Sequence, residues 1–213
     1  NGPVGTIIPA NDTANTAPRR VFEVGAAGNL TLDGVTVRHG RCVVACATLG
    51  VEGGGILNQG TLAVTNSTVS NNTATNGGGI YNSGTATVTN STLSGNAATG
   101  DGGGIYNNQG TVTMTNSALS GNSALVGGGI FNYIGTATVT NSTLSGNSTT
   151  TSGSGIFNSF DSTATVTNST LSGNSAADLG GGIYNGGTAT VTNSTLSGNS
   201  AKYGGGIINE DGT

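Results

Sequence analysis

Acidic side chains are the residues of this chain that most readily suggest catalysis. Glycoside hydrolysis needs two facing carboxylates, and metal-assisted lyases need an acidic cluster with a basic residue beside it. Between residues 50 and 200 the acids are Glu52, Asp101, Asp161 and Asp178, each in a variable linker of a different repeat, with no Arg or Lys nearby. We interpret them as solvated turn residues, so the sequence predicts no catalytic residues and no enzyme activity.

Three potential metal ligands lie close together near the start of the chain. His39, Cys42 and Cys46 have suitable side chains, but a structural zinc site needs four ligands and this spacing supplies no fourth. We expect neither a metal nor a cofactor. The two cysteines are instead interpreted as a disulfide or as a buried thiol pair.

Charge and hydropathy exclude two classes of partner. Charged residues make up 7% of the 213 residues, the net charge is −4, and no basic residue lies between Cys42 and Ala201. A surface without a basic stripe cannot neutralise phosphates, so we expect no nucleic-acid partner. No apolar run approaches the ~18 residues of a membrane-spanning helix, so we expect no membrane insertion.

The chain is organised as a repeat. Gly-Gly-Gly-Ile, or once Gly-Ser-Gly-Ile, recurs with steps of 24 to 27 residues between its isoleucines. These isoleucines are Ile56, Ile80, Ile105, Ile130, Ile156, Ile183 and Ile207. A fixed period in this range is typical of a solenoid, whose units bury their apolar faces only by stacking on one another.

Each repeat has the chemistry of short strands. In Thr-Ala-Thr-Val-Thr at residues 85–89 the apolar and polar residues alternate with the period of two of a half-buried strand. Leu93, with Thr92 and Ser94 around it, predicts a second strand, and residues 79–81 predict a third. The sequence therefore predicts an all-β, single-stranded parallel β-helix with three short strands per coil of about 24–27 residues. We expect right-handed coiling, the hand of nearly all parallel crossovers.

Asparagine recurs at three positions of each repeat, in columns that begin at Asn58, Asn66 and Asn72. Asn tolerates the left-handed backbone of a sharp corner, and its amide can bond the equivalent amide of the next coil. We expect all three columns to form corner ladders. Asn-Ser-Thr sequons within them, as at Asn90 and Asn141, are interpreted as corner residues and not as glycosylation sites.

The repeats resemble a known family. Gly-Gly-Gly-Ile-Tyr-Asn together with Leu-Ser-Gly-Asn is similar to the paired GGA[ILV] and FxxN signatures of the chlamydial polymorphic outer membrane protein repeats and of related bacterial β-helix proteins. Leu93 stands where that motif has Phe, and Gly79 where it has Ala. The resemblance runs from about Asn29 to the C-terminus, and it implies an extracellular or cell-surface location with adhesive, passenger or structural roles.

The two ends of the chain differ from the repeats. Residues 1–28 hold all three prolines and two adjacent arginines, which are typical of a protected sheet edge, so we predict an N-terminal cap or subunit-contact segment. Residues 29–213 are predicted to form the β-helix with an incomplete last coil. We expect the open coil end to meet another copy of the chain, head to tail, and so to build a fibre.

A threonine array is the basis of an alternative function. Thr side chains at alternate positions would form a flat surface, ~7 Å apart along strands and ~4.8 Å between coils. This pattern resembles the Thr-x-Thr faces of antifreeze proteins and predicts ice binding. The members of this Thr array are Thr85, Thr87, Thr89, Thr111, Thr113, Thr115, Thr136, Thr138, Thr140, Thr163, Thr165, Thr167, Thr188, Thr190 and Thr192.

The residues that directly follow the seven repeated isoleucines form a second column, which is mostly aromatic. Neighbouring residues of a strand point to opposite faces, so only the isoleucines or their successors can be in the core. We expect the successors to face outward as a continuous exposed apolar stripe, widened by Tyr133, Ile134 and Phe160. The members of this aromatic column are Leu57, Tyr81, Tyr106, Phe131, Phe157, Tyr184 and Ile208.

These patterns favour a secreted structural or adhesive protein that self-assembles head to tail, with lateral contacts between subunits or glycans on the aromatic column. It would form a filament or part of a longer cell-surface protein. Ice binding through the Thr array is the first alternative. A polysaccharide-binding or polysaccharide-degrading β-helix is the second.

Overall fold

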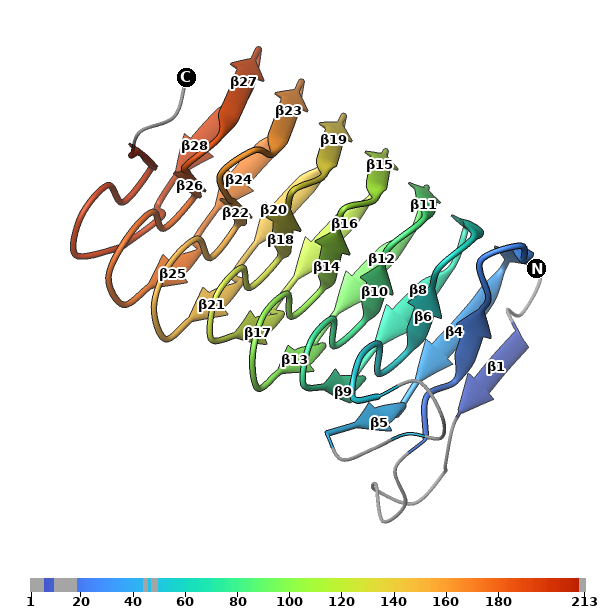
Figure 1. The fold of residues 1–213 in the computed structure, drawn as a ribbon. Helices are drawn as coiled ribbons and strands as arrows, with labels where there is room; N and C mark the ends of the chain where they lie inside the picture. Colours follow the sequence, from blue (N-terminus) through green and yellow to red (C-terminus); the bar gives the residue numbers. More distant parts are fainter. Residues whose placement is uncertain (1–5, 10–18, 44–45, 47–49, 211–213) are drawn as a thin grey trace.

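The repeat unit folds as one turn of a parallel β-solenoid (Figure 1). The computed structural model describes residues 6–9, 19–43, 46 and 50–210. Each interior strand pairs in parallel with the equivalent strands of the coils before and after it, as β10 (Ile80–Asn82) does with β6 (Ile56–Asn58) and β14 (Ile105–Asn108). The predicted all-β parallel β-helix is confirmed, and its right-handed coiling stays a prediction.

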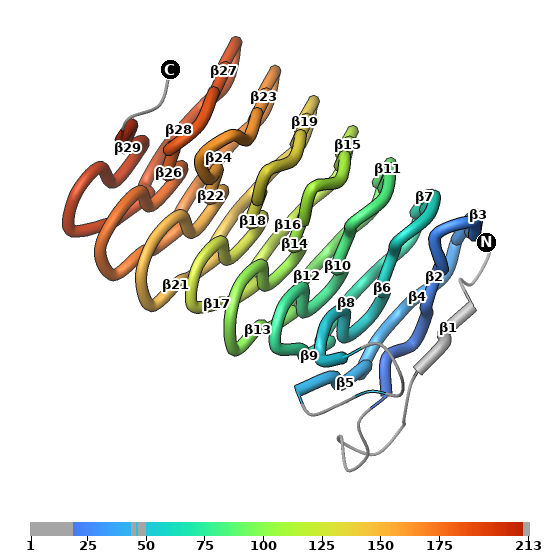
Figure 2. Tube along the Cα trace, in the orientation of Figure 1, coloured from blue at the N-terminus to red at the C-terminus, as the bar shows by residue number. Residues whose placement is uncertain are grey.

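Coils stack along one axis, so that β2 (Phe22–Val24) and β29 (Ile207–Asn209) lie at opposite ends of the rod (Figure 2). Four sheets run along the rod, and we name them after their residues. The Thr sheet contains β3 (Asn29–Asp33), β7 (Thr61–Thr65), β11 (Thr85–Thr89), β15 (Thr111–Thr115), β19 (Thr136–Thr140), β23 (Thr163–Thr167) and β27 (Thr188–Thr192).

A second sheet, the Leu sheet, follows the Thr sheet along the chain in each coil. It contains β1 (Thr6–Pro9), β4 (Val35–Arg38), β8 (Thr68–Ser70), β12 (Thr92–Ser94), β16 (Ala118–Ser120), β20 (Thr143–Ser145), β24 (Thr170–Ser172) and β28 (Thr195–Ser197).

The aromatic sheet is built from the Ile-Tyr-Asn segments. It contains β2 (Phe22–Val24), β6 (Ile56–Asn58), β10 (Ile80–Asn82), β14 (Ile105–Asn108), β18 (Ile130–Tyr133), β22 (Ile156–Asn158), β26 (Ile183–Asn185) and β29 (Ile207–Asn209).

A fourth, short-strand sheet corrects the prediction of three strands per coil. Its two-residue strands are β5 (Arg41–Cys42), β9 (Thr73–Ala74), β13 (Ala97–Ala98), β17 (Ser123–Ala124), β21 (Ser148–Thr149) and β25 (Ser175–Ala176). The linker after Leu-Ser-Gly-Asn looks variable in sequence, yet its first two residues pair in register with the neighbouring coil, as Ala97 and Ala98 do with Thr73 and Ala74 of the coil before. Each of the six coils from β2 to β25 therefore has four strands.

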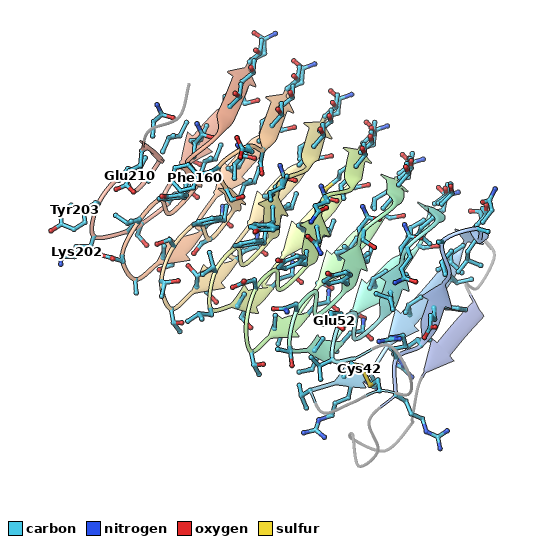
Figure 3. All side chains as sticks on the ribbon, in the orientation of Figure 1. Cys42, Glu52, Phe160, Lys202, Tyr203 and Glu210 are labelled. Atoms are coloured by element: carbon cyan, nitrogen blue, oxygen red, sulfur yellow. A yellow bond between two sulfur atoms is a disulfide. The ribbon has the colours of Figure 1, made fainter. Side chains whose placement is uncertain are left out.

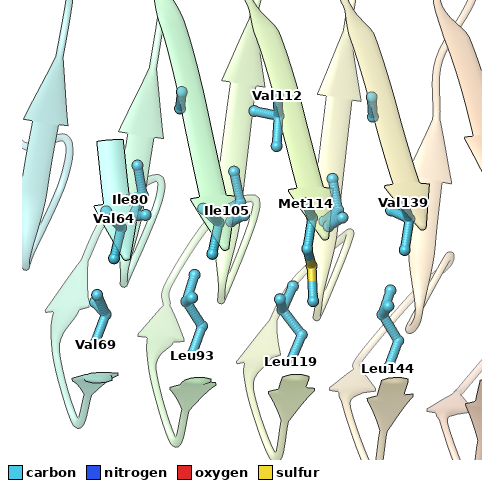
Figure 4. Close-up of a cluster of buried hydrophobic side chains, with 14 of the residues drawn as sticks. Val64, Val69, Ile80, Leu93, Ile105, Val112, Met114, Leu119, Val139 and Leu144 are labelled. Atoms are coloured by element: carbon cyan, nitrogen blue, oxygen red, sulfur yellow. The ribbon is translucent and has the colours of Figure 1, made fainter. Parts of the chain in front are cut away.

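The core is made of axial columns of aliphatic side chains (Figure 4). Val88 and Leu93 are fully buried, as are their equivalents Val139 and Leu144 in a later coil, while the Thr residues beside them point outward. The predicted parity of the strands is confirmed there. In the last coil Val191 and Leu196 are only partly buried, because no later coil covers them within the described part of the chain.

Glycine is required in the Gly-Gly-Gly turn for two separate reasons. Gly102 has a φ of +67°, in the left-handed region that glycine adopts without strain. At Gly104 a Cβ would lie 2.6 Å from the carbonyl oxygen of Gly129, so a side chain has no room. In the coil with Gly-Ser-Gly-Ile, the hydroxyl of Ser154 lies 2.9 Å from that of Thr149, which replaces the usual small Ala.

Two of the three asparagine columns form buried ladders. In the first inner ladder, each Nδ2 donates to the Oδ1 of the next coil at 2.9–3.0 Å, as from Asn96 to Asn122. Its members are Asn72, Asn96, Asn122, Asn147, Asn174 and Asn199. The second inner ladder is connected in the same way. Its members are Asn58, Asn82, Asn107, Asn132, Asn158, Asn185 and Asn209.

The third column is different, and the prediction of a corner ladder there is only half right. Its members, which we call the outer column, are Asn66, Asn90, Asn116, Asn141, Asn168 and Asn193. They take the predicted left-handed conformation, with φ of 49–50°, but their side chains are exposed. Among the described residues, one hydrogen bond joins two of these amides, from Asn90 to Asn66 at 3.4 Å. The ladder at this corner is formed by the buried serine that follows, since Ser91 N–H donates to Ser117 Oγ at 3.0 Å.

The N-terminal segment partly continues the solenoid. Residues 22–24, which the sequence analysis places in the cap, pair in register with β6, and β1 pairs with β4. Residues 1–5 and 10–18 of the predicted cap lie outside the described residues, as do residues 211–213 of the predicted last coil. The described residues contain no helix with the length and apolar character needed to cross a membrane.

Candidate functional site

The aromatic column forms a stacked ladder on the outer face of the aromatic sheet (Figure 3). Neighbouring rings from Tyr81 to Tyr184 lie 4.4–5.1 Å apart between centroids, with interplanar angles of 3–17°. The isoleucines before them are in the core, so the predicted orientation of this strand is right. Stacking is possible because the parallel register places each ring directly over the equivalent ring of the next coil.

The ladder is less exposed than the sequence predicts. Leu57, Phe131 and Tyr184 are 2%, 7% and 8% exposed, whereas Tyr81, Tyr106 and Phe157 are half-buried. Each ring covers the faces of its neighbours, so the surface offers mainly ring edges. The continuous exposed apolar stripe is therefore corrected to a largely self-covered stack.

Polar groups line the N-terminal part of this ladder. Asn108 Nδ2 donates to the Tyr81 hydroxyl at 2.6 Å. Burial raises the pKa of Tyr81 and of Tyr106, and nearby negative charge, including the Glu52 carboxylate, adds to both shifts. Burial also raises the pKa of Asp101, whose charge acts on Tyr106. This end therefore combines phenol hydroxyls with carboxylates, while the middle of the ladder is formed by Phe131 and Phe157.

The turns beside the ladder carry the exposed apolar residues that the sequence analysis singled out. Tyr133, the last residue of β18, and Ile134, in the turn after it, are exposed, and Phe160 is 58% exposed in the turn after β22. Tyr133 extends the stack sideways, with its ring 6.4 Å from that of Phe131. The structure thus brings Tyr133 and Phe160 next to the ladder, beside Phe131 and Tyr184 respectively.

The Thr array lies on the outer face of the Thr sheet. All fifteen of its residues are half-buried or exposed, and equivalent threonines pair in register from coil to coil, as Thr138 does with Thr113 and Thr165. The inward positions between them are filled by Ala and Val, and in β15 also by Met114. The array is therefore a regular surface of β-branched hydroxyl side chains.

Cys42 and Cys46 are joined by a disulfide, with their Cα atoms 5.5 Å apart. Arg20 donates to the Cys42 sulfur at 3.8 Å and to the Glu52 carbonyl at 3.0 Å. Arg20 thereby links β5 to the linker that precedes β6. Both sulfurs are used in the disulfide, which leaves His39 without the thiolates of the metal alternative. Among the described residues, no three His, Cys, Asp or Glu side chains form a group that could hold a metal ion.

Comparison with known families gives one finding. Residues 66–83, 90–108 and 168–186 match the Chlamydia polymorphic membrane protein repeat. The resemblance to these repeats is confirmed. Each matched segment begins at or beside the outer column and runs to the aromatic ladder, so it covers the corner, the Gly-Gly-Gly turn and the Ile-Tyr-Asn strand.

Polymorphic membrane protein repeats are typically non-catalytic passenger-domain repeats, and the family is associated with the outer membrane and the cell surface. The chain is therefore a parallel β-helix in which three segments are similar to this repeat. No match was found among curated proteins or among solved structures.

Sequence reasoning missed one feature of the surface. A hollow of about 430 Å³ lies between the turn that carries Phe160 and the Gly186–Gly187 turn of the next coil. The signal in the sequence was the difference in length between these two adjacent linkers, of four residues and two. Each linker looks unremarkable when it is considered alone.

Proposed function

We propose that this chain is a non-enzymatic rod of an extracellular or cell-surface protein, and that its aromatic face is an adhesive surface. The observation that carries the proposal is the stack of five rings from Tyr81 to Tyr184, which continues across the coils and is flanked by exposed Tyr133 and Phe160. Aromatic residues are enriched at interfaces because they bury large areas and pack in defined geometries.

The stack suits adhesion because it is preorganised. Rings that are already held by their neighbours lose little rotational freedom when a partner covers their edges, so little binding energy is spent on ordering them. The match to polymorphic membrane protein repeats supports the same proposal, since that family is surface-associated.

Binding of the purified chain to fixed cell monolayers, measured by fluorescence, tests the adhesive surface. Replacing Tyr106 and Phe157 with Ser should lower the amount bound at least about tenfold, a loss of ~1.4 kcal/mol. The matched control replaces Thr113 and Thr165 with Ser on the Thr sheet, and it should bind as the unmodified chain does. Equal binding of both variants, or no binding of the unmodified chain, would refute the proposal.

Ice binding is the second candidate, and the register of the Thr array is the observation that favours it. Each strand of the Thr sheet from β11 to β27 carries three outward threonines, which pair in register with those of the neighbouring strand. All of these side chains are half-buried or exposed. The purified chain would then shape ice crystals and show thermal hysteresis. Replacing Thr138 and Thr140 with Tyr should abolish the hysteresis, and ordinary freezing of the unmodified chain would remove this candidate.

Self-association is proposed as part of the same function. At the last coil the inward-facing Ile207 is 44% exposed, whereas the equivalent isoleucines of the preceding coils are fully buried. This exposed apolar surface could pack against a further coil from the same or another copy. Head-to-tail contacts at this end, and lateral contacts through the aromatic face, would build a fibre. Light scattering over a range of concentrations should show growth beyond the monomer, and a constant monomer mass would contradict it.

A further inference from the structure

The hollow beside Phe160 results from a step between two neighbouring turns. The turn from β22 to β23 has four residues, Ser159 to Ser162, whereas the turn from β26 to β27 has only Gly186 and Gly187. Because neighbouring coils lie ~4.8 Å apart, the long turn stands over the bare glycines of the next coil. The resulting space, about 430 Å³, is within the range of small-molecule sites of roughly 300–1,000 Å³.

The long turn is held in one shape. Ser162 N–H donates to the Ser159 carbonyl at 3.2 Å, the two serine hydroxyls lie 3.2 Å apart, and the Ser162 hydroxyl reaches the Asn132 carbonyl at 3.2 Å. Asp161 has a φ of +57°, which turns the chain back towards β23. Both serines are buried, so Phe160 and Asp161 are the residues that this turn presents to solvent.

The lining of the hollow combines one aromatic ring with several hydrogen-bonding groups. Phe160, Asp161 and Ser162 line it from the long turn, and Thr163 and Thr188 add exposed hydroxyl side chains from the following strands. A Cβ at Gly186 would lie 3.6 Å from the Phe160 ring and 3.5 Å from the Tyr184 ring, so both rings flank this glycine. Phe160 is labelled in Figure 3 beside the row of stacked rings.

We propose that this hollow is a saccharide-binding subsite of the adhesive surface. A sugar ring has a face of C–H groups, which the exposed Phe160 ring would cover, and a rim of hydroxyls. Asp161 would accept hydrogen bonds from two of these hydroxyls, and charged acceptors make the stronger ones. Thr163 and Thr188 hydroxyls both donate and accept, as sugar hydroxyls do.

The same chemistry selects among sugars. Asp161 is the charged side chain that lines the hollow, so a uronic or sialic acid would meet a like charge, whereas a neutral or N-acetylated sugar would not. The single aromatic ring and the polar rim favour a saccharide over an apolar peptide segment, which would leave the carboxylate without a partner. This inference rests on the proposed adhesive function and names its ligand class.

Gly186 provides a way to close the hollow without disturbing the fold. The equivalent turns in other coils carry Gln59 and Ser83 at this position, so the backbone accepts a side chain there. At Gly186 the nearest atoms to an added Cβ lie at ordinary contact distances of 3.5–3.6 Å. Gly186→Gln should therefore fill the space. Ser83→Gln is the matched control, because it places the same side chain at the equivalent position beside a coil that lacks the four-residue turn.

An array of immobilised neutral, N-acetylated and acidic oligosaccharides, probed with the folded chain, tests the subsite. The unmodified chain should bind neutral or N-acetylated sugars, and Phe160→Ala, Asp161→Asn and Gly186→Gln should each weaken that binding at least about tenfold, while Ser83→Gln leaves it unchanged. Thermal unfolding of each variant checks that the fold is kept. Preference for acidic sugars, binding to no sugar, or equal binding by all variants would overturn the proposal.

The cell-monolayer assay separates this inference from the proposed function. Adhesion that persists in Phe160→Ala and Gly186→Gln but is lost when the ladder is altered would refute the subsite and leave the adhesive surface intact. Sugar binding by a chain that does not adhere to cells would support the subsite and refute the adhesive function. Release of reducing ends from the bound oligosaccharides would instead contradict the non-enzymatic assignment.

Discussion

The inner ladders and the outer column use the same residue at the same repeat spacing for different purposes. In an inner ladder, Asn122 accepts from Asn96 and donates to Asn147 and to the Leu93 carbonyl, with no exposed surface. In the outer column, Asn116 is exposed and has a φ of 50°. The inner asparagines are therefore required for their amides, and the outer ones for the backbone conformation that they tolerate.

The strongest contrast between inside and outside lies in one strand of the Thr sheet. Val139 is fully buried and Thr138 points outward. Val139→Asp would bury an unpaired charge and should cost more than about 4 kcal/mol of unfolding free energy. Thr138→Asp should cost about 1 kcal/mol or less, mainly through strand propensity. Urea unfolding of both variants measures the difference, and similar losses would contradict the strand parity.

Removing one inner amide should have the next largest effect. Asn122→Ala removes the acceptor of the Asn96 backbone N–H and of one Asn96 side-chain N–H, and it removes a donor from the Leu93 carbonyl. Unsatisfied buried groups cost ~1–3 kcal/mol each, so we expect a loss of about 3–5 kcal/mol. Asn116→Ala, in the same coil but in the outer column, should cost at most about 1 kcal/mol. Comparable losses at the two positions would mean that the outer column is also held by its amides.

Backbone conformation should decide how much stability a substitution in the outer column costs. Asn116→Gly keeps the left-handed conformation available and should leave stability within about 1 kcal/mol of the unmodified chain. Asn116→Val places a β-branched residue at positive φ and should cost roughly 1–2 kcal/mol. The order of the two melting temperatures checks the prediction. A glycine variant less stable than the valine variant would show that the side chain matters more than φ.

The smallest expected effect concerns Asp101 beside the ladder. Burial raises its pKa, so the folded chain favours the protonated carboxyl, and this contribution to stability is lost as the pH rises through the folded pKa. Asp101→Asn should therefore be more stable than the unmodified chain at pH 7, by on the order of a few tenths of a kcal/mol. The difference should vanish below the ordinary aspartate pKa of ~3.9, where both forms are neutral. A difference that grows on acidification would have the wrong sign.

Much of this architecture could be predicted from periodicity. Alternation in Thr-Ala-Thr-Val-Thr identified the buried valines, and the 24–27-residue step identified the stacking. The short strand at Ala97–Ala98 was missed because two residues are too few to show alternation, although small residues recur there. Asn at a corner looks the same in sequence whether its amide points in or out, so the sequence predicts a ladder at the outer column as well.

The candidate surfaces depended on contacts that one repeat alone does not reveal. The aromatic ladder was predicted to face outward, but its self-covering depends on ring separations of 4.4–5.1 Å between coils. The hollow at Phe160 depends on the glycine turn of a different coil, 26 residues later in the case of Gly186. Differences between neighbouring repeats, more than the consensus, therefore locate the site.

Hydrogen exchange of the asparagine side-chain amides, measured by NMR, tests the central contrast most directly. Amide protons of Asn96 and Asn122 are bonded within a buried ladder and should exchange only through opening of the coil, many-fold more slowly than an exposed amide. Those of Asn116 and Asn141 in the outer column should exchange at rates close to those of a free side chain. A single class of rates for all four residues would contradict the division into inner ladders and outer column.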